Sequence, residues 1–389
     1  MRRPPPLADE LVEEVLFRLP PDDPASLVSA ALACRHFRRL VADPGFRRRY
    51  RRFHRTPPLL GFLRRVGGAT SFAPATSSSF LPRGADRFLR DCLAIGTRHG
   101  RVLLLLREPT IDIFPINEYV ALAIWDPVSG DLRRLPTFQF IHRARNAVLL
   151  CTAPGCGGAG GDHLDCPRGG PFAVVRVSTE ARRITTAYIF SSESGKWRQT
   201  ARVNHDVDGV KVGHHPLVGD AIYFLLVKSN GILEYDLKEE KFSSISLPPV
   251  CRKESNVILA KMEDGGLGFG IMQGFNLCMW SRDSDSEGWT QRRVIELYRL
   301  LPTPARSARS TFPSMLPSML PRLIAIADCG SVIFTWTWRI EFFAIDLKSG
   351  RVTKVPGERT GFVPYTSFCT PALRADPSDG APIPNACDE

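Results

Sequence analysis

Residues 7–46 read LADELVEEVLFRLPPDDPASLVSAALACRHFRRLVADPGF and predict a short helical module. Leu11, Val15 and Leu19 fall at i, i+4 and i+8, so they share one face of a helix, with Leu16 beside them. Pro20 and Pro21 cannot continue that helix. The first helix is therefore expected to end before residue 20.

Two further helix starts follow in the same stretch. Asp23-Pro24 and Asp43-Pro44 each place a capping carboxylate before a proline that presets the first helical turn. Apolar residues recur every three or four positions between them, with a break expected near Cys34. A module of about fifty residues buries only about 60% of its unfolded surface, so it is expected to need a partner.

These residues resemble the plant F-box pattern. The matching positions are Leu7, Leu11, Glu14, Val15, Leu16, Arg18, Leu19, Pro20, Pro21, Leu27, Cys34, Arg35, Arg38, Leu40, Val41, Asp43, Pro44 and Phe46. The chain departs from the pattern at Ala8 (Pro), Ser29 (Arg), Ala33 (Val) and Phe37 (Trp). Phe37 keeps an aromatic side chain, whereas Ser29 removes a cation that an adaptor contact could use.

The resemblance implies a partner. F-boxes dock on a Skp-type adaptor, which holds a cullin-RING ubiquitin ligase. The residues expected to bind the adaptor or support its binding face are Leu7, Leu11, Val15, Leu16, Leu19, Pro20, Leu27, Phe37 and Leu40. The alternative is an ordinary helical cap on the domain that follows.

The positive charge of the chain is concentrated near its start. Residues 1–65 carry 14 Lys and Arg against 7 Asp and Glu, out of a formal net charge of +11. The excess centres on residues 47–55, where Phe46, Tyr50 and Phe53 form an aromatic stripe on one helix face. A nuclear-import or nucleic-acid patch is one interpretation. A solvated helix packed by its aromatic stripe is favoured, because no basic stripe continues beyond it.

Composition favours a globular, intracellular protein. The chain has 389 residues and 43% hydrophobic content, enough for a small module and one large domain. Its longest aliphatic run, residues 102–106, is far below the length of a membrane span. No signal peptide is expected. Ten cysteines at irregular spacing suggest a reducing compartment.

From about residue 86 the pattern changes to repeated strands. Five segments share a strand, a polar corner and a shorter strand, and their corners are Asp126, Ser191, Asp236, Ser281 and Asp346. Their spacing falls near 45 residues once a glycine-rich stretch (153–171) and a proline- and serine-rich stretch (302–321) are counted as loop insertions. A period near 45 is the length of a four-stranded propeller blade.

The stretches Gly219–Leu225, Ile232–Leu237, Ile245–Pro249, Gly265–Gly268 and Leu277–Trp280 look like the plant F-box-associated domain. Such domains are kelch-like β-propellers that carry a substrate-recognition surface. The predicted fold is α+β multidomain, a three-helix F-box followed by an all-β propeller of five to seven blades, with a β-sandwich as the alternative. The expected divisions are 1–50 (F-box), 51–85 (basic helix and Pro/Ser-rich linker), 86–375 (propeller) and 376–389 (disordered tail).

Several constellations invite a chemical interpretation. Cys151, Cys156, His163 and Cys166 have zinc-ligand types, but their spacing fits no finger pattern. His205, Asp206, Asp208, His214 and His215 precede a strand and are interpreted as a polar inter-blade loop. Residues 266–270 are not a dinucleotide loop, because no helix pattern follows. No catalytic residue, metal site or cofactor is predicted, and the substrate-binding residues stay unassigned.

The sequence therefore predicts a non-catalytic receptor subunit of an SCF-type E3 ubiquitin ligase, in the nucleus or cytoplasm. The module would bind a Skp-type adaptor, and the propeller would hold an unidentified protein for ubiquitylation and degradation; membrane and nucleic-acid partners are not expected. Two alternatives remain: an F-box scaffold outside ubiquitylation, and a propeller lectin or enzyme with incidental N-terminal helices.

Overall fold

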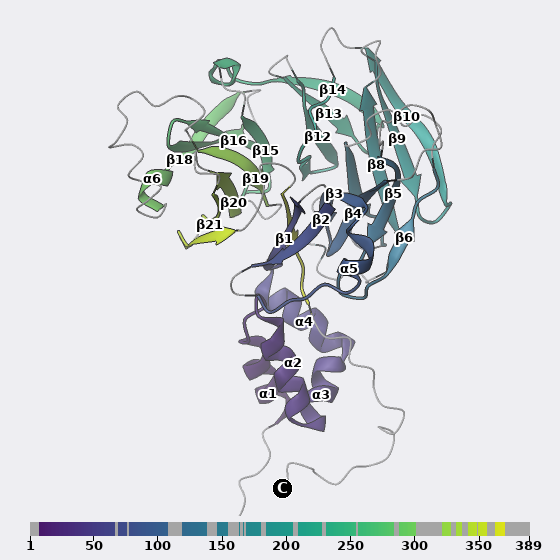
Figure 1. The fold of residues 1–389 in the computed structure, drawn as a ribbon, viewed down its shortest axis with the longest axis vertical. Helices are drawn as coiled ribbons and strands as arrows, with labels where there is room; N and C mark the ends of the chain where they lie inside the picture. Colours follow the sequence, from purple (N-terminus) through teal and green to yellow (C-terminus); the bar gives the residue numbers. More distant parts are fainter. Residues whose placement is uncertain are drawn as a thin grey trace, which may run out of the picture.

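The computed structural model contains a helical module and a ring of β-sheets (Figure 1). The described residues are 8–66, 69–75, 78–107, 119–137, 146–154, 163, 166, 169–179, 184–204, 209–227, 231–253, 256–283, 288–300, 321–327, 332–336, 341–347, 349–355 and 362–369. Among these residues, no helix is long and apolar enough to span a membrane.

Four helices form the module: α1 (Asp9–Phe17), α2 (Pro24–Ala33), α3 (Arg35–Ala42) and α4 (Pro44–His54). The expected break occurs at Cys34, whose backbone is extended and whose Sγ accepts a hydrogen bond from Phe37 N–H at 3.5 Å. Asp43 caps α4 as predicted, since its Oδ2 accepts from Phe46 N–H at 2.7 Å. Asp23 accepts no backbone N–H of α2 in this way, but its Oδ2 accepts a hydrogen bond from the hydroxyl of Ser26 in the first turn at 2.6 Å.

The module is larger than the three-helix unit of residues 1–50 that the sequence suggested. Its fourth helix, α4, runs to His54 because Phe46 and Tyr50 are buried in the same core as α1–α3. The basic stretch is thus part of this helix.

Five four-stranded antiparallel sheets follow, each ordered as a meander. Blade 1 contains β3 (Cys92–Arg98), β4 (Arg101–Arg107), β5 (Tyr119–Trp125) and β6 (Leu132–Arg134). Blade 2 contains β7 (Ala147–Cys151), β8 (Phe172–Thr179), β9 (Ile184–Ser191) and β10 (Lys196–Asn204). Blade 3 contains β11 (Leu217–Val218), β12 (Ala221–Leu225), β13 (Gly231–Asp236) and β14 (Lys241–Ser246).

The last two blades have the same order. Blade 4 contains β15 (Val257–Lys261), β16 (Leu267–Gln273), β17 (Asn276–Arg282) and β18 (Trp289–Glu296). Blade 5 contains β19 (Arg322–Ile326), β20 (Val332–Trp336), β21 (Phe342–Asp346) and β22 (Val352–Val355). In the part of the chain that the structure describes, three short helices lie between strands: α5 (Ala85–Phe88), η1 (Pro249–Lys253) and α6 (Leu297–Leu300).

A three-stranded sheet closes the ring by joining distant parts of the chain. Its order is β2 (Ala69–Pro74), β1 (Leu59–Val66) and β23 (Val363–Thr366), so that Gly61 pairs with Tyr365 on one side and Pro74 on the other. Contacts of β23 with β3 and of β19 with β23 complete the circle. The predicted β-propeller is confirmed, with five four-stranded blades and this closing sheet.

The closing sheet changes the expected division of the chain. Residues 51–85 were expected to be a helix and linker, but they contain the end of α4 and two strands of the ring. The pairing partner of β1 is about three hundred residues away, so no local repeat marks this strand. The segment expected as a tail, 376–389, lies outside the described residues.

The five predicted corners all occur at the end of a blade's third strand. Asp126 Oδ1 accepts from Val128 N–H at 2.8 Å, and Asp236 Oδ1 accepts from both Lys238 and Glu239 N–H at 2.8 Å. The carboxylate at the corner thus accepts hydrogen bonds from backbone N–H groups that have no backbone partner within the tight turn. Ser281 differs: its Oγ accepts from Arg292 Nε at 2.6 Å, and blade 4 turns two residues later.

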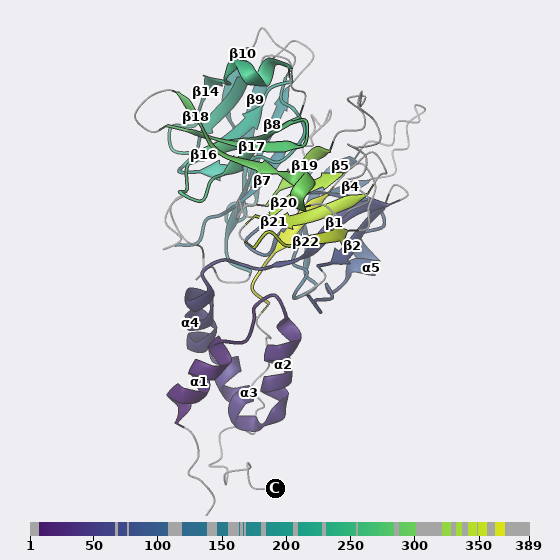
Figure 2. The same ribbon diagram turned by 90° about the vertical axis from the view of Figure 1, so that its left-hand side faces the viewer.

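The module packs against one face of the ring (Figures 1 and 2). Phe368, which follows β23, is 7% exposed and belongs to the module's own apolar core. Ser367 N–H donates to Pro58 O at 3.2 Å, and Ser79 Oγ donates to Asp23 Oδ1 at 2.8 Å. The segment after β23 and the segment after β2 therefore both contact the helical module.

Candidate functional site

Helix α1 presents two apolar faces. Val12 and Leu16 are buried at 7% and 3% exposure in the core of the module. Leu11 and Val15, one position earlier in each case, are 54% and 63% exposed. A pair of large apolar side chains on the solvent side of a short helix is typical of a protein-binding face.

The predicted adaptor-binding residues divide between these environments. Leu16, Leu27 and Leu40 are buried in the core, and Leu19 and Phe37 pack partly buried against it. Leu11, Val15 and Pro20 are exposed. Leu7 lies outside the described residues.

The expectation of one face containing Leu11, Val15 and Leu19 therefore needs a correction. Helix α1 ends at Phe17, and Leu19 N–H donates to Leu16 O in the turn that follows. Leu19 thus lies beyond the last residue to which helical spacing applies, and it turns toward the core.

One exposed apolar residue of the module was missed by sequence reasoning. Leu32, near the end of α2, is 70% exposed. It follows Ala30 and Ala31 in an apolar run. Because polar and apolar residues do not alternate there, the sequence does not indicate which side of the helix faces the solvent. Ser29, the departure from the F-box pattern, is also exposed on this helix.

The basic helix α4 is anchored through its aromatic stripe. Tyr50 is 3% exposed, and its hydroxyl donates to Leu19 O at 3.0 Å. Burial raises the pKa of Tyr50, which keeps this hydroxyl protonated as a donor. Phe53, although exposed, stacks on Phe17 with ring centroids 5.9 Å apart. The packed-helix interpretation of residues 47–55 thus agrees with the structure.

An ion pair joins the first and fourth helices of the module. Arg49 Nη2 donates to Glu13 Oε1 at 2.6 Å, and Arg49 Nε donates to Glu13 Oε2 at 3.1 Å. This two-point contact joins α4 to α1, and the side chain of Glu13 is only 17% exposed. It fixes α1, and with it the exposed face that contains Leu11 and Val15.

The propeller has a central cavity of about 380 Å³. Its walls come mainly from the innermost strands, and the lining residues are Arg65, Leu93, Ala94, Ile95, Gly96, Thr97, Val212, Gly213, His214, Ile324, Ala325, Phe362, Val363, Pro364 and Thr366. The lining is largely apolar, and Arg65 and His214 are its only ionisable members among the described residues.

The predicted polar cluster before blade 3 has a structural role where it is described. His215 is 5% exposed, its Nε2 lies 3.1 Å from Asn146 Oδ1, and its ring packs on Phe224. Burial, with a smaller effect of His214 and Arg98, lowers the pKa of His215 to about 3. The ring is therefore neutral at physiological pH. His205, Asp206 and Asp208 lie outside the described residues.

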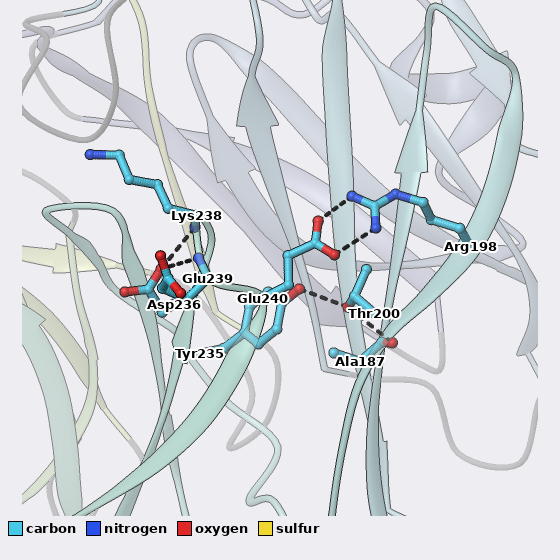
Figure 3. A network of polar contacts seen from close by, with 8 residues as sticks. All are labelled: Ala187, Arg198, Thr200, Tyr235, Asp236, Lys238, Glu239 and Glu240. Atoms are coloured by element: carbon cyan, nitrogen blue, oxygen red, sulfur yellow. Dashed lines mark hydrogen bonds and ion pairs between the residues drawn. The ribbon is translucent and has the colours of Figure 1, made fainter.

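The blades are joined by polar contacts across their outer strands (Figure 3). Tyr235 of β13 donates its hydroxyl to Thr200 Oγ1 of β10 at 2.7 Å, and Arg198 forms an ion pair with Glu240. Trp289 Nε1 donates to Ser246 O at 2.9 Å in the next seam. These contacts hold neighbouring blades together.

Comparison with known proteins places two family models on the chain. The F-box domain model matches residues 7–49. The model described as "F-box protein AT5G49610-like, beta-propeller" matches residues 164–362, just over half of the chain. No curated protein matches significantly.

Two solved structures show weak likeness. One is a protein from Lactobacillus plantarum, with 10% identity, covering 77% of this chain and 81% of that one, at a TM-score of 0.39. The other is a chain of the mitotic checkpoint complex, with 12% identity, covering 68% and 62%, at a TM-score of 0.34. Scores this low support no conclusion about this chain.

Proposed function

Because the chain belongs to the AT5G49610-like F-box proteins with a beta-propeller, we propose that it is the substrate receptor of an SCF-type E3 ubiquitin ligase. The helical module binds a Skp-type adaptor and, through it, a cullin. The propeller holds a target protein. The observation that carries this proposal is that Leu11 and Val15 are exposed on α1, whereas Val12 and Leu16 of the same helix are buried in the core of the module.

The adaptor contact is apolar. Two large side chains exposed by more than half, on a helix held by the Arg49–Glu13 pair, are an anchor that a partner groove can bury. Leu16, Leu27 and Leu40 support this face from the core without touching the partner. Leu32 on α2 offers a further apolar contact.

The target-binding surface is assigned to the ring face opposite the module. In a meander, the first and third turns of each blade emerge at one face and the remaining connections at the other. Tyr365 OH donates to Gly100 O in a first turn, and Arg83 N–H donates to Pro127 O in a third turn, on the module's side. The opposite face, with the Gly274 turn and η1, is left for a target.

The receptor contributes proximity and no reactive group. Holding a target lysine near a ubiquitin thioester raises its effective concentration, which needs only two binding surfaces at a fixed separation. The docking of Phe368 into the module supplies that fixed separation. We place this activity in the nucleus or cytoplasm, where such ligases operate.

The test replaces the exposed pair. Leu11→Asp with Val15→Asp should weaken pull-down of a Skp-type adaptor by at least about tenfold, since burying an unpaired charge removes more than 1.4 kcal/mol of binding free energy. Val227→Asp, at a residue 50% exposed on the propeller, is the matched control and should bind normally. Unchanged binding by the double variant contradicts the proposal.

A second measurement separates a ligase receptor from a scaffold. The wild-type chain should co-purify a cullin together with the adaptor. Proteasome inhibition should increase the amount of target protein that co-purifies with the wild-type chain. The Leu11→Asp/Val15→Asp variant should still bind that target protein, because its propeller is unchanged. Adaptor without cullin would favour an F-box scaffold acting outside ubiquitylation.

A further inference from the structure

Four metal-ligand side chains from two blades lie together beside the glycine-rich insertion. The ligand atoms of His99, His163 and Cys166 all lie within 4.8 Å of one another. Cys151, the last residue of β7, adds a second sulfur, since its Sγ is 3.3 Å from Cys166 Sγ. Three of these residues were weighed as zinc ligands from the sequence, but His99 lies fifty residues before them and was not.

We propose that these residues form a structural zinc site of the Cys2His2 type, with Cys151, Cys166, His99 and His163 as ligands. Thiolate and imidazole are the donors that tetrahedral zinc prefers. Neither family match accounts for such a cluster, and neither the proposed adaptor contact nor the target face requires it.

Two of the ligand distances are close to those of a tetrahedral zinc site. Zn–S of about 2.3 Å and Zn–N of about 2.0 Å place two sulfurs about 3.8 Å apart and a sulfur and a nitrogen about 3.5 Å apart. Cys166 Sγ to His163 Nδ1 is 3.4 Å, and the two sulfurs are 3.3 Å apart. A disulfide would need about 2.05 Å. Closure around zinc requires the ligand atoms of His99, His163 and Cys166, which lie within 4.8 Å of one another, to approach by about an ångström. Cys151 Sγ, which contacts Cys166 but does not belong to that close set, must move toward the two histidines as well.

The backbone holds His99 and His163 in position. His99 occupies the β3–β4 turn with φ of 52°, and the Gly100 that follows has φ of 74°. This turn is fixed by the Tyr365 hydroxyl, which donates to Gly100 O at 2.9 Å. The rings of His99 and His163 lie 4.2 Å apart. The β3–β4 hairpin thus presents His99 toward His163.

The other side of the cluster is anchored as well. Cys151 pairs with Phe172 where β7 meets β8, so its position is set by the sheet. Arg101, next to the His99 turn, donates from Nη2 to Gly170 O at 2.9 Å and lies over the Phe172 ring at 5.5 Å. Blade 1 therefore already contacts the end of the insertion, and a zinc ion would join the same two elements at a second point.

The site would act on the fold and not on a substrate. Zinc would tie the β3–β4 hairpin of blade 1 to the β7–β8 connection of blade 2, on the ring face that carries the module. The two thiols lose their protons on binding, so the affinity rises with pH.

The experiment measures zinc in the purified full chain after removal of any affinity tag. Elemental analysis and native mass spectrometry should give about one zinc per chain. His99→Ala, Cys151→Ser and Cys166→Ser should each weaken zinc binding, measured by competition with a chromogenic chelator, by at least about tenfold. Bound cobalt should show the intense visible absorption of tetrahedral coordination in the wild type alone.

A matched control keeps the result interpretable. Cys34→Ser replaces a capping cysteine of the helical module, outside the cluster, by a better cap, and this variant should keep its zinc. Circular dichroism checks that each variant is folded. A chain without zinc, a mass lower by the two hydrogens of a Cys151–Cys166 disulfide, or zinc that His99→Ala leaves unchanged would each overturn the proposal.

Discussion

At Gly268, in β16, two neighbouring strands come too close to admit a side chain. A Cβ atom there would lie 2.5 Å from the backbone oxygen of Trp280 and 2.2 Å from Met262 Sδ. Met262 can move, but the backbone of β17 cannot. The glycine run that does not match a dinucleotide loop thus has a packing role in blade 4.

Gly268→Ala should destabilise the chain by about 1–3 kcal/mol, because the strands must separate to admit the methyl group. Denaturant unfolding of the full chain measures this free energy. Gly96→Ala is the control, since nothing lies within 4 Å of its added Cβ, and it should be nearly neutral. Equal effects of both substitutions would contradict the steric explanation.

The burial of His215 predicts that the free energy of unfolding falls at acid pH. Its pKa is about 3 in the folded chain, against 6.5 for an unperturbed histidine, so the unfolded chain binds a proton between those values that the folded chain does not. The stabilisation is complete above pH 6.5. It should fall by about 1.4 kcal/mol per pH unit as the pH drops from 6.5 toward 3.

Thermal melting across that pH range tests this expectation. His215→Gln can keep the hydrogen bond to Asn146 without the titration, so its stability should fall less steeply than that of the wild type. His36→Gln, which alters a half-buried histidine of the module, should retain the steep fall. Parallel curves for wild type and His215→Gln would refute the role of this residue.

At the scale of single elements, different residues of α1 determine the stability of the module and its binding to the adaptor. Leu16→Ala should cost about 2–5 kcal/mol of unfolding free energy, because it leaves a cavity in the core of the module. Val15→Ala, one residue earlier, should cost little, since its side chain is exposed. Denaturant unfolding compares the two variants, and adaptor pull-down should show the opposite order for any variant that remains folded.

The elements also show what the sequence can and cannot predict. The corners at Asp126 and Asp236 were predictable because each polar turn follows its strand directly. Leu19 was placed on one face with Leu11 because Pro20 and Pro21 show only that α1 ends before residue 20, whereas α1 already ends at Phe17. Strand β1 was missed because its partner, β23, lies at the other end of the chain. His99 was missed as a metal ligand for the same reason, since folding alone brings it to His163.

For the whole molecule, β23 connects the two domains. Phe368→Ala should cost about 3–5 kcal/mol in the module, because it empties a core position occupied from the ring. It should also separate unfolding into two transitions, since the shared side chain couples the two domains. Scanning calorimetry of the full chain measures both effects.

Phe362→Ala is the control for that experiment. This residue is buried at 7% exposure, like Phe368, but it packs among Phe62 and Phe342 in the ring. Its loss should lower the stability of the propeller and leave the module's own transition in place. A single cooperative transition for Phe368→Ala, merely shifted in temperature, would show that other contacts couple the domains.

The placement of Phe368 has a consequence for biosynthesis. Chains are made from the N-terminus, and domains generally fold in that order during translation. Here the helices are synthesised more than three hundred residues before Phe368 and β23, which complete the core of the module and the ring. We therefore expect a chain interrupted before β23 to lack both a closed ring and a complete module, and so to bind its partners poorly.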